Sequence, residues 1–392
     1  MKLVYLIAAT CNSGGMERVL AGKANWFAAR GHEVAIVTTD QRGREPYFPL
    51  DERIKTYDLD INYDTDNGHL LSKLLHYPLR QWRHRRRLTA LLKRLKADVV
   101  ICMFNNDVAF VHKIQDGSHK VLEIHFSKNK KLQYGRRGLW ALADRWRTRQ
   151  EEKMVSNYDR FVVLTHEDAA LWGNLPNMAV IPNARTFQPE RQADLSRQRV
   201  LAIGRYDYQK GFDRLIDIWE RGESERGESE RVKSGGVKSE KSGWTLDIIG
   251  DGPLRPALQE QVQRLGLQDS VRLLKSTSHV QDAYLGASIF VLTSRYEGLP
   301  MVLLEAQACG LPIVAFTCQC GPRDVVTDGN DGFLIPDGNE DLFAEKLSFL
   351  MEHQDERERM GTHAREASDR FSEQQVMRAW EKLLGELIPE TT

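Results

Sequence analysis

Long apolar runs are missing from this sequence of 392 residues. No stretch reaches the roughly 18 apolar residues that a membrane-spanning helix needs, so a protein crossing the membrane by helices is not expected. Cysteine is scarce as well, and the cysteines are odd in number and irregularly spaced. Such a set favours reduced thiols and a cytoplasmic location over a disulfide framework. The cysteines are Cys11, Cys102, Cys309, Cys318 and Cys320.

The whole chain has no net charge, because 55 basic side chains balance 55 acidic ones. The two halves of the chain, however, differ in net charge. Residues 1–185 carry 30 Lys or Arg against 20 Asp or Glu. The remaining residues carry the opposite excess. One half therefore offers a positive surface, which indicates an anionic partner or a membrane face.

Short apolar runs alternate with helical patterns along the chain, which is typical of βαβ units and parallel sheets. We predict an α/β protein with two doubly wound domains, 1–184 and 185–371, and a C-terminal helix, 372–392, that packs back on the first. Expected strands cover residues 3–9, 33–39, 98–103, 120–126, 160–165, 199–205, 244–250, 271–275, 289–294, 312–316 and 332–336. A helix over 16–30 should end at Gly31, in a left-handed conformation.

One segment, 222–242, interrupts this alternation. It contains GESER twice in tandem, and its apolar residues are Val232 and Val237. So few apolar side chains cannot offset the entropy of ordering the segment, so we expect a solvated, mobile loop.

Candidate ligand residues lie where strands are expected to end, because ligands of open α/β sheets bind at the carboxyl ends of the strands. Gly14 and Gly15 follow the first strand and allow close approach of a ligand to the backbone, although a plain glycine-rich turn fits equally well. Arg205 and Lys210 follow the first strand of the second domain. They can converge on a diphosphate, or they can form surface ion pairs.

Two glutamates, Glu297 and Glu305, flank the start of an expected helix. Pro300 fits the first helical turn, so the two carboxylates are not expected to share a helix face. They can instead reach different parts of one elongated ligand, and carboxylates suit sugar diols. The alternative is one glutamate at a helix dipole and one on the surface. Gly298 and Leu299 can offer backbone amides.

His125, at the end of expected strand 120–126, is the candidate in the first domain. It can bind a sugar hydroxyl or stabilise developing charge, or it can be a structural histidine.

In this order, the motifs GG-x-ER, GRxxxxKG and EGLPMVLLE resemble the retaining glycosyltransferases of family 4. "IPNA", "IIGDGPLRPALQE" and "GPRDVVTDGNDGFLI" are similar to family segments as well. The resemblance implies the GT-B fold, in which two Rossmann-like domains face a central cleft. Within the family, the chain is similar to enzymes that extend glycans on lipid carriers for bacterial surface polysaccharides.

The resemblance also implies roles for the candidate residues. Arg205 and Lys210 would bind the donor diphosphate, Glu297 the donor-sugar hydroxyls and Glu305 the ribose. Backbone amides from Gly298 to Met301, with Leu299 and Pro300 between them, would support sugar and phosphates. Gly14 and Gly15 would lie over the diphosphate, and His125 would line the acceptor side.

The family generally works without a metal, and a UDP-sugar is the donor most often used. The acids of "DLD" (58–60) and "DTD" (64–66) imitate a metal motif but are interpreted as solvated loop acids. We expect retention by same-face displacement assisted by the leaving phosphate.

A basic segment, 78–96, holds eight Lys or Arg and no acid. Its leucines follow helical spacing, so one face packs while the cations stay in water. A second cluster, 127–150, mixes cations with tryptophans. Both suit an anionic membrane or the pyrophosphate of a polyprenyl-linked acceptor, although a solvated helix face is also open. No nucleic-acid module accompanies them. The residues expected to act are Arg83, Arg85, Arg86, Arg87, Lys128, Lys130 and Lys131.

We therefore expect a cytoplasmic enzyme, peripheral on the inner leaflet, that transfers a sugar to a glycan or lipid-linked acceptor. A sugar-nucleotide epimerase of the same architecture and a non-catalytic carbohydrate-binding protein are the alternatives.

Overall fold

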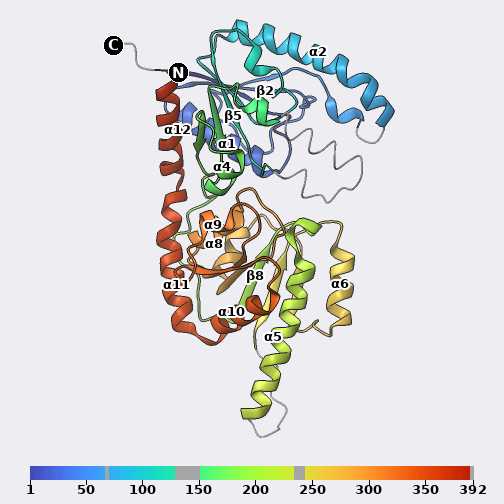
Figure 1. The fold of residues 1–392 in the computed structure, drawn as a ribbon, viewed down its shortest axis with the longest axis vertical. Coiled ribbons are helices and arrows are strands. Elements are labelled where there is room, and N and C mark those ends of the chain that lie inside the picture. Colours follow the sequence, from blue (N-terminus) through green and yellow to red (C-terminus); the bar gives the residue numbers. More distant parts are fainter. Residues whose placement is uncertain (67–69, 129–150, 234–242, 389–392) are drawn as a thin grey trace. The chain divides into compact units, whose positions relative to one another are not determined.

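The computed structural model describes residues 1–66, 70–128, 151–233 and 243–388. The chain forms two compact units (Figure 1). The first contains Met1–Asn183 together with Val376–Thr392, and the second contains Ala184–Gln375. Each unit is built around its own parallel sheet.

The sheet of the first unit has seven parallel strands. They are β1 (Lys2–Leu6), β2 (Glu33–Thr38), β3 (Lys55–Asp58), β4 (Val99–Cys102), β5 (His119–Glu123), β6 (Arg160–Val163) and β7 (Met178–Val180). Their order is β3-β2-β1-β4-β5-β6-β7. The central strands are apolar on both faces because helices cover both sides of a doubly wound sheet. The order reverses direction between β1 and β4, which is the switch point where such sheets bind ligands.

Helices of the first unit include α1 (Gly15–Ala29), α2 (Leu70–Leu95), α4 (His166–Trp172) and α12 (Glu373–Leu387), with short 3-10 turns η1 (Tyr63–Asp66) and η2 (Val111–Lys113). Gly31 has φ of 83°, the left-handed conformation expected after α1. Helix α12 packs beside α1, where the Trp26 indole donates to Glu381 at 3.3 Å.

The sheet of the second unit has six parallel strands in the order β10-β9-β8-β11-β12-β13. They are β8 (Arg199–Ile203), β9 (Thr245–Ile249), β10 (Val271–Leu274), β11 (Ile289–Leu292), β12 (Ile313–Phe316) and β13 (Gly332–Ile335). The switch point lies between β8 and β11. Both sheets confirm the predicted class of two doubly wound parallel sheets, and each of the eleven expected strands is present within a few residues.

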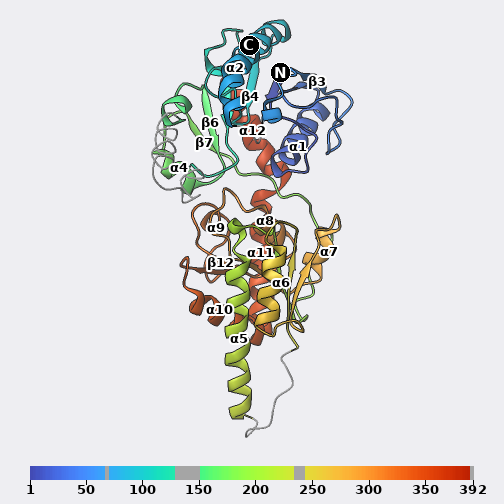
Figure 2. The same cartoon turned by 90° about the vertical axis from the view of Figure 1, so that its right-hand side faces the viewer.

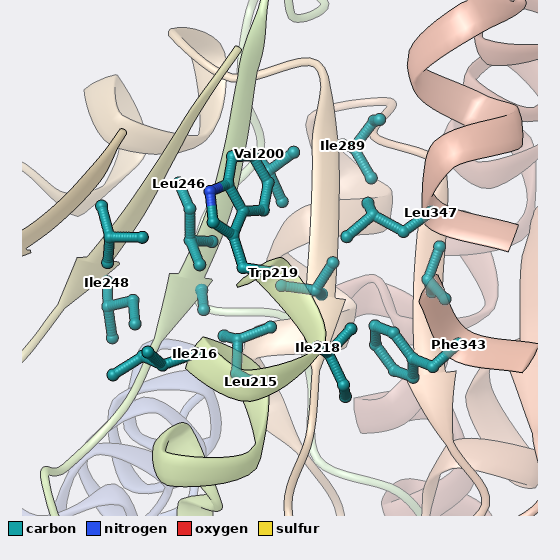
Figure 3. Close-up of a cluster of buried hydrophobic side chains, with 14 of the residues drawn as sticks. Val200, Leu215, Ile216, Ile218, Trp219, Leu246, Ile248, Ile289, Phe343 and Leu347 are labelled. Atoms are coloured by element: carbon teal, nitrogen blue, oxygen red, sulfur yellow. The ribbon is translucent and has the colours of Figure 1, made fainter. Parts of the chain in front are cut away.

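Helices of the second unit cover both faces of its sheet (Figure 2). They are α5 (Phe212–Lys233), α6 (Arg255–Arg264), α7 (Val280–Leu285), α8 (Met301–Ala308), α9 (Pro322–Val325), α10 (Glu340–Glu352) and α11 (Gln354–Ala367), with η4 (Tyr208–Lys210) and η5 (Ser368–Phe371). Figure 3 shows the core, in which the buried Trp219 of α5 lies against Val200 and Leu246 of the sheet while Phe343 and Leu347 approach from α10.

Two strands and the full length of one helix were not expected from the sequence. Strands β3 and β7 lie at the two edges of their sheet, where a strand needs no continuous apolar run. The expected loop over 222–242 was wrong for its first part, because α5 continues to Lys233. Glu and Arg are good helix formers, and the repeat places them three residues apart, so a helix nucleated on the buried first turns can extend through it. Residues 234–242 lie outside the described residues.

Candidate functional site

The loops at the switch point of the second unit hold four of the predicted donor residues. The loop after β8 carries Arg205 and Lys210, and the loop after β11 carries Glu297, followed by α8 with Glu305. Strands β8 and β11 are direct neighbours in the sheet. Their following loops therefore leave the sheet side by side.

Gly211 allows these two loops to lie in contact. Its φ is 64°, and a Cβ there would fall 2.2 Å from the carbonyl oxygen of Thr293. Any side chain would therefore push the β8 loop away from the β11 loop. In the turn before Gly211, Asp207 accepts a hydrogen bond from the backbone N–H of Lys210 at 3.3 Å, which fixes the short η4 helix.

Lys210 and Glu297 form an ion pair at the centre of the site. The Nζ atom of Lys210 lies 2.7 Å from Oε1 of Glu297, and their side chains are 17% and 7% exposed. Gln209 donates to the other oxygen of Glu297 at 3.4 Å. The structure thus brings together two residues that stand 87 positions apart in the chain.

Arg205 stands on the same loop but faces solvent. Its side chain is 71% exposed, and its Nε donates to Asp207 at 2.6 Å. An exposed guanidinium on the same loop as a fixed ammonium is a suitable arrangement for an anionic ligand.

Glu305 is buried in the second turn of α8, which begins at Met301 directly after Pro300. One carboxylate oxygen accepts from the hydroxyl of Thr186 at 2.6 Å. The other accepts from the hydroxyl of Tyr284 at 2.7 Å. Both oxygens are held by hydroxyl donors, so the Glu305 carboxylate is fixed in orientation.

The sequence did not point to Thr186 or Tyr284. Thr186 follows the "IPNA" connector, and Tyr284 lies on α7. Neither belongs to a recognisable spacing with Glu305, so local pattern carries no signal for this contact.

Arg214 was missed as well, and it supports the loop after β11. Its guanidinium donates to the carbonyl oxygens of Thr293 and Ser294, both at 2.6 Å, and pairs with Asp337 at 2.8 Å. A neighbouring pair joins Asp213 to Arg295. Burial by itself raises the pKa of Asp213, but the hydrogen bonds and charge of Arg295 outweigh it and lower the pKa.

In the first unit, Gly14 and Gly15 lie at the start of α1. Gly14 is the N-cap, and a Cβ there would clash with the carboxylate of Glu17 at 2.2 Å. At Gly15 a Cβ would meet nothing within 4 Å. The backbone at Gly15 is therefore open to a ligand.

His125 lies two residues beyond β5, which ends at Glu123, so the histidine does not end the strand as expected. Its Nε2 lies 3.2 Å from Oε1 of Glu123. The other oxygen of Glu123 pairs with the buried Lys23 of α1. Burial raises the pKa of Glu123, but the charge of Lys23, together with the neighbouring His125, outweighs burial and holds that pKa at about 2.

A polar cavity of about 430 Å³ lies at the switch point of the first unit. Its walls come from the segments that follow β1, β2, β3 and β4 and from α2. They include two acids, two arginines, an amide and an aromatic ring: Asp40, Asp64, Arg44, Arg80, Asn12 and Tyr77.

The basic face of α2 is as expected, because four of its leucines, Leu88, Leu91, Leu92 and Leu95, are buried and four of its arginines are exposed. The exposed set comprises Arg83, Arg85, Arg86 and Arg87. Leu79 and Trp82 are also exposed, at 47% and 57%. Lys128, in contrast, is 13% exposed and pairs with Glu152 at 2.6 Å. Lys130 and Lys131 lie outside the described residues, as does most of the cluster 127–150.

No group of three His, Cys, Asp or Glu that could hold a metal occurs among the described residues. Asp58 of the DLD segment accepts from the backbone N–H of Arg42 at 3.0 Å, and Asp64 of the DTD segment pairs with the guanidinium of Arg42. No helix in the described part of the chain is both long and apolar enough to span a bilayer.

The chain matches two known family models, one for each half. Residues 184–367 match the family model described as "Glycosyl transferases group 1". Residues 13–185 match the model described as "Glycosyltransferase Family 4". The two matches meet at the boundary between the two units.

Individual proteins of similar length match as well. The amylovoran biosynthesis glycosyltransferase AmsD of Erwinia amylovora is 25% identical, over 98% of this chain and 99% of that protein. An α-1,4-N-acetyl-D-galactosaminyltransferase of Campylobacter jejuni, acting on a diNAcBac-PP-undecaprenol-linked glycan, is 25% identical over 99% of both chains. The pneumococcal O-GlcNAc transferase GtfA, solved with UDP and GlcNAc, superposes with a TM-score of 0.71 at 14% identity, covering 100% of this chain and 99% of that one.

Two parallel-sheet units give the chain the GT-B fold, and the family matches and relatives identify a nucleotide-sugar glycosyltransferase. The chain belongs to the group 1, family 4 glycosyltransferases.

Proposed function

We propose that this glycosyltransferase moves a sugar from a UDP-sugar, with retention of configuration, to the glycan of a lipid-linked acceptor in bacterial surface polysaccharide assembly. The observation that carries the proposal is the pairing of Lys210 with Glu297 at 2.7 Å beside the fixed carboxylate of Glu305. The relatives named above act in such pathways or bind UDP.

Each donor residue has a role that follows from its chemistry. Glu305 is an acceptor for the ribose hydroxyls, because a held carboxylate binds a diol with little loss of side-chain entropy. Glu297 accepts from hydroxyls of the transferred sugar. Lys210 and Arg205 neutralise the diphosphate, and amides at the start of α8 from Gly298 to Met301 add donors.

Departure of the diphosphate leaves negative charge on its terminal oxygen as the glycosidic bond to the donor breaks. Lys210 is already fixed by Glu297 and by Asp207, so it stabilises that charge without reorganising. Arg205 completes the stabilisation when it leaves Asp207 for the phosphate. Stabilising this charge lowers the barrier to attack by the acceptor hydroxyl on the same face, and the hydroxyl proton passes to the leaving phosphate oxygen.

The acceptor sugar is assigned to the polar cavity of the first unit. Acids and arginines balance in its lining, so the cavity suits a neutral, hydroxyl-rich ring better than a pyrophosphate. Its volume falls within the range of small-molecule sites. His125 belongs to the same unit and faces the acceptor side in this proposal.

The basic face of α2 is assigned to the membrane that carries the acceptor. Four exposed arginines stand beside the exposed Leu79 and Trp82, and cations next to apolar side chains suit the anionic headgroup region. This assignment makes the enzyme peripheral on the cytoplasmic leaflet.

A panel of sugar nucleotides tests the donor assignment. Thermal unfolding is measured with UDP, GDP and their sugars, and sugar release is followed with each donor. We expect UDP and one UDP-sugar to raise the Tm, and Glu305→Ala to abolish that rise while the free protein still unfolds cooperatively.

A matched control is Glu340→Ala, which removes a surface carboxylate of the same unit that pairs with Arg221. If Glu305→Ala left the protection by UDP unchanged, the ribose assignment would be wrong. If the donor were isomerised without acceptor, the enzyme would be an epimerase and the proposal would fail.

A further inference from the structure

A chain of three buried charged or polar groups ends at His125. It begins at Lys23 on α1, passes through Glu123 at the end of β5 and reaches Nε2 of the histidine. The three side chains are 5%, 2% and 7% exposed. All three lie in the first unit, and none belongs to the donor site.

Aromatic rings close the other sides of this group. The Nζ atom of Lys23 lies 4.2 Å from the ring centroid of Trp380, on α12, and 5.8 Å from that of Tyr5. Burial lowers the pKa of Lys23, and the charge of Glu123 opposes that shift. The C-terminal helix therefore shields the pair from water at the carboxyl side of the sheet.

Stability alone does not account for this arrangement. Desolvating two charges costs about as much as their attraction returns, and apolar side chains of the same size often stabilise a protein equally well. A buried pair is therefore better explained when it does something that apolar side chains cannot do. Orienting a neighbouring imidazole through the charge of the carboxylate is such a task.

We propose that Glu123, fixed by Lys23, is a positioning residue for His125. Oε1 of the carboxylate lies 3.2 Å from Nε2, so its charge favours a proton on that nitrogen and leaves Nδ1 to accept a hydrogen bond from a sugar hydroxyl. Lys23 neutralises the carboxylate, and Trp380 keeps the ammonium in place. This inference rests on the proposed role of His125 in the transfer reaction.

The chain offers a matched control for the test. Lys120, on the same strand β5, pairs with Asp116 at 2.5 Å, with side chains 6% and 0% exposed. The Nζ atom of Lys120 contacts Asp116 and Ser118, and this second buried pair lies at the other end of the strand from Glu123. Neutralising it perturbs burial and charge to a similar degree without touching His125.

The experiment compares Lys23→Met/Glu123→Leu with Lys120→Met/Asp116→Leu. We expect both double variants to keep a Tm within about 8 °C of the native protein. Only Lys23→Met/Glu123→Leu should lose turnover, with kcat lower by about tenfold or more. Its KM for the UDP-sugar should stay within about twofold of the native value, because the donor is bound by other residues. Lys23→Met/Glu123→Gln, which retains an acceptor oxygen at position 123, should recover most of kcat.

A readout that needs no donor separates this inference from the proposed function. Long-range proton–nitrogen NMR spectra of histidine-labelled protein report the tautomer, and His125→Asn assigns the signal. We expect the Nε2–H form in the native protein and in Lys23→Met/Glu123→Gln, and a mixture of forms in Lys23→Met/Glu123→Leu.

An unchanged tautomer in Lys23→Met/Glu123→Leu overturns the inference, and so does an equal loss of kcat in both double variants. If the native protein turned over no sugar nucleotide in the panel, the proposed function would fail. The tautomer would then still decide whether Glu123 positions His125.

Discussion

At the scale of single residues, the donor site depends on side chains that support the ones touching the ligand. Glu305 is held by Thr186 and Tyr284, and Glu297 by Lys210 and Gln209. Their carboxylates are buried, so these bonds fix them before a ligand arrives. Preorganisation of this kind lowers the cost of binding because little side-chain freedom remains to be lost.

Removal of the Tyr284 hydroxyl should weaken donor binding. Tyr284→Phe deletes one neutral hydrogen bond to Glu305, so the Kd for UDP should rise by about two- to tenfold. Titration calorimetry with UDP measures this change. The control is Tyr158→Phe, which removes a buried hydroxyl bond of 2.8 Å in the first unit. An equal rise in both variants would contradict a local role for Tyr284.

A methyl group at position 211 should separate the two donor loops. Gly211→Ala places a Cβ 2.2 Å from a backbone oxygen and forces alanine to adopt φ of 64°. Gly266→Ala serves as the comparison, because φ there is 70° but nothing lies within 4 Å.

Urea unfolding measures the outcome. Both variants carry the left-handed strain of about 1 kcal/mol, and Gly211→Ala should lose at least about 1 kcal/mol more from overpacking. Gly211→Ala should also lose protection by UDP. Equal destabilisation with UDP protection intact would show that the loops tolerate separation.

At the scale of elements, helices provide side chains that hold the loops of the site, which the sheets alone would not support. Arg214 lies near the start of α5 and holds the backbone of the β11 loop, so this helix both covers the sheet and supports the site. Helix α2 has buried leucines on one face and exposed arginines on the other. One element thus provides a core surface and an anion-binding surface.

Flotation with liposomes tests the exposed face of α2. Replacing Arg83, Arg85, Arg86 and Arg87 by Gln removes four cations that each contribute about 1 kcal/mol near an anionic surface, so the partition coefficient should fall by about a hundredfold or more. Replacing Lys93 and Arg94, on the last turn of the same helix, should have a smaller effect. Binding that survives the fourfold change, or equal binding to neutral vesicles, would count against membrane docking.

At the scale of the whole molecule, each unit keeps a complete core of its own. The core of the first unit includes a buried histidine, His84 of α2, whose Nδ1 lies 3.2 Å from the hydroxyl of Tyr63. Burial lowers the pKa of His84 to about 4. The folded protein therefore keeps this ring neutral where the unfolded chain would protonate it.

This depressed pKa makes the first unit sensitive to acid. Between the unfolded pKa near 6.5 and about 4, the unfolded state binds one more proton, so stability falls as the pH falls. The loss from this group is on the order of 3 kcal/mol. Urea unfolding of the native protein and of His84→Leu from pH 7 to pH 4 measures it, and the variant should show a shallower decline. Parallel declines would contradict the assignment.

Much of the fold followed from local pattern. The eleven predicted strands were recognisable because an apolar run between helical segments has few other stable outcomes. Strands β3 and β7 were not, because they are short and none of their residues is fully buried. The end of α5 was missed because composition alone suggested disorder, whereas an anchored helix can propagate through charged residues.

The sequence by itself determined the two-sheet architecture, the family and the motif residues of the candidate site, because these depend on short-range periodicity and on fixed spacings. Only the tertiary structure decided which side chains support those residues. Thr186 and Tyr284 reach Glu305, and Lys23 reaches Glu123, across 119, 21 and 100 positions of the chain. Such contacts arise when the sheet brings distant segments to one edge, and no local pattern encodes that distance.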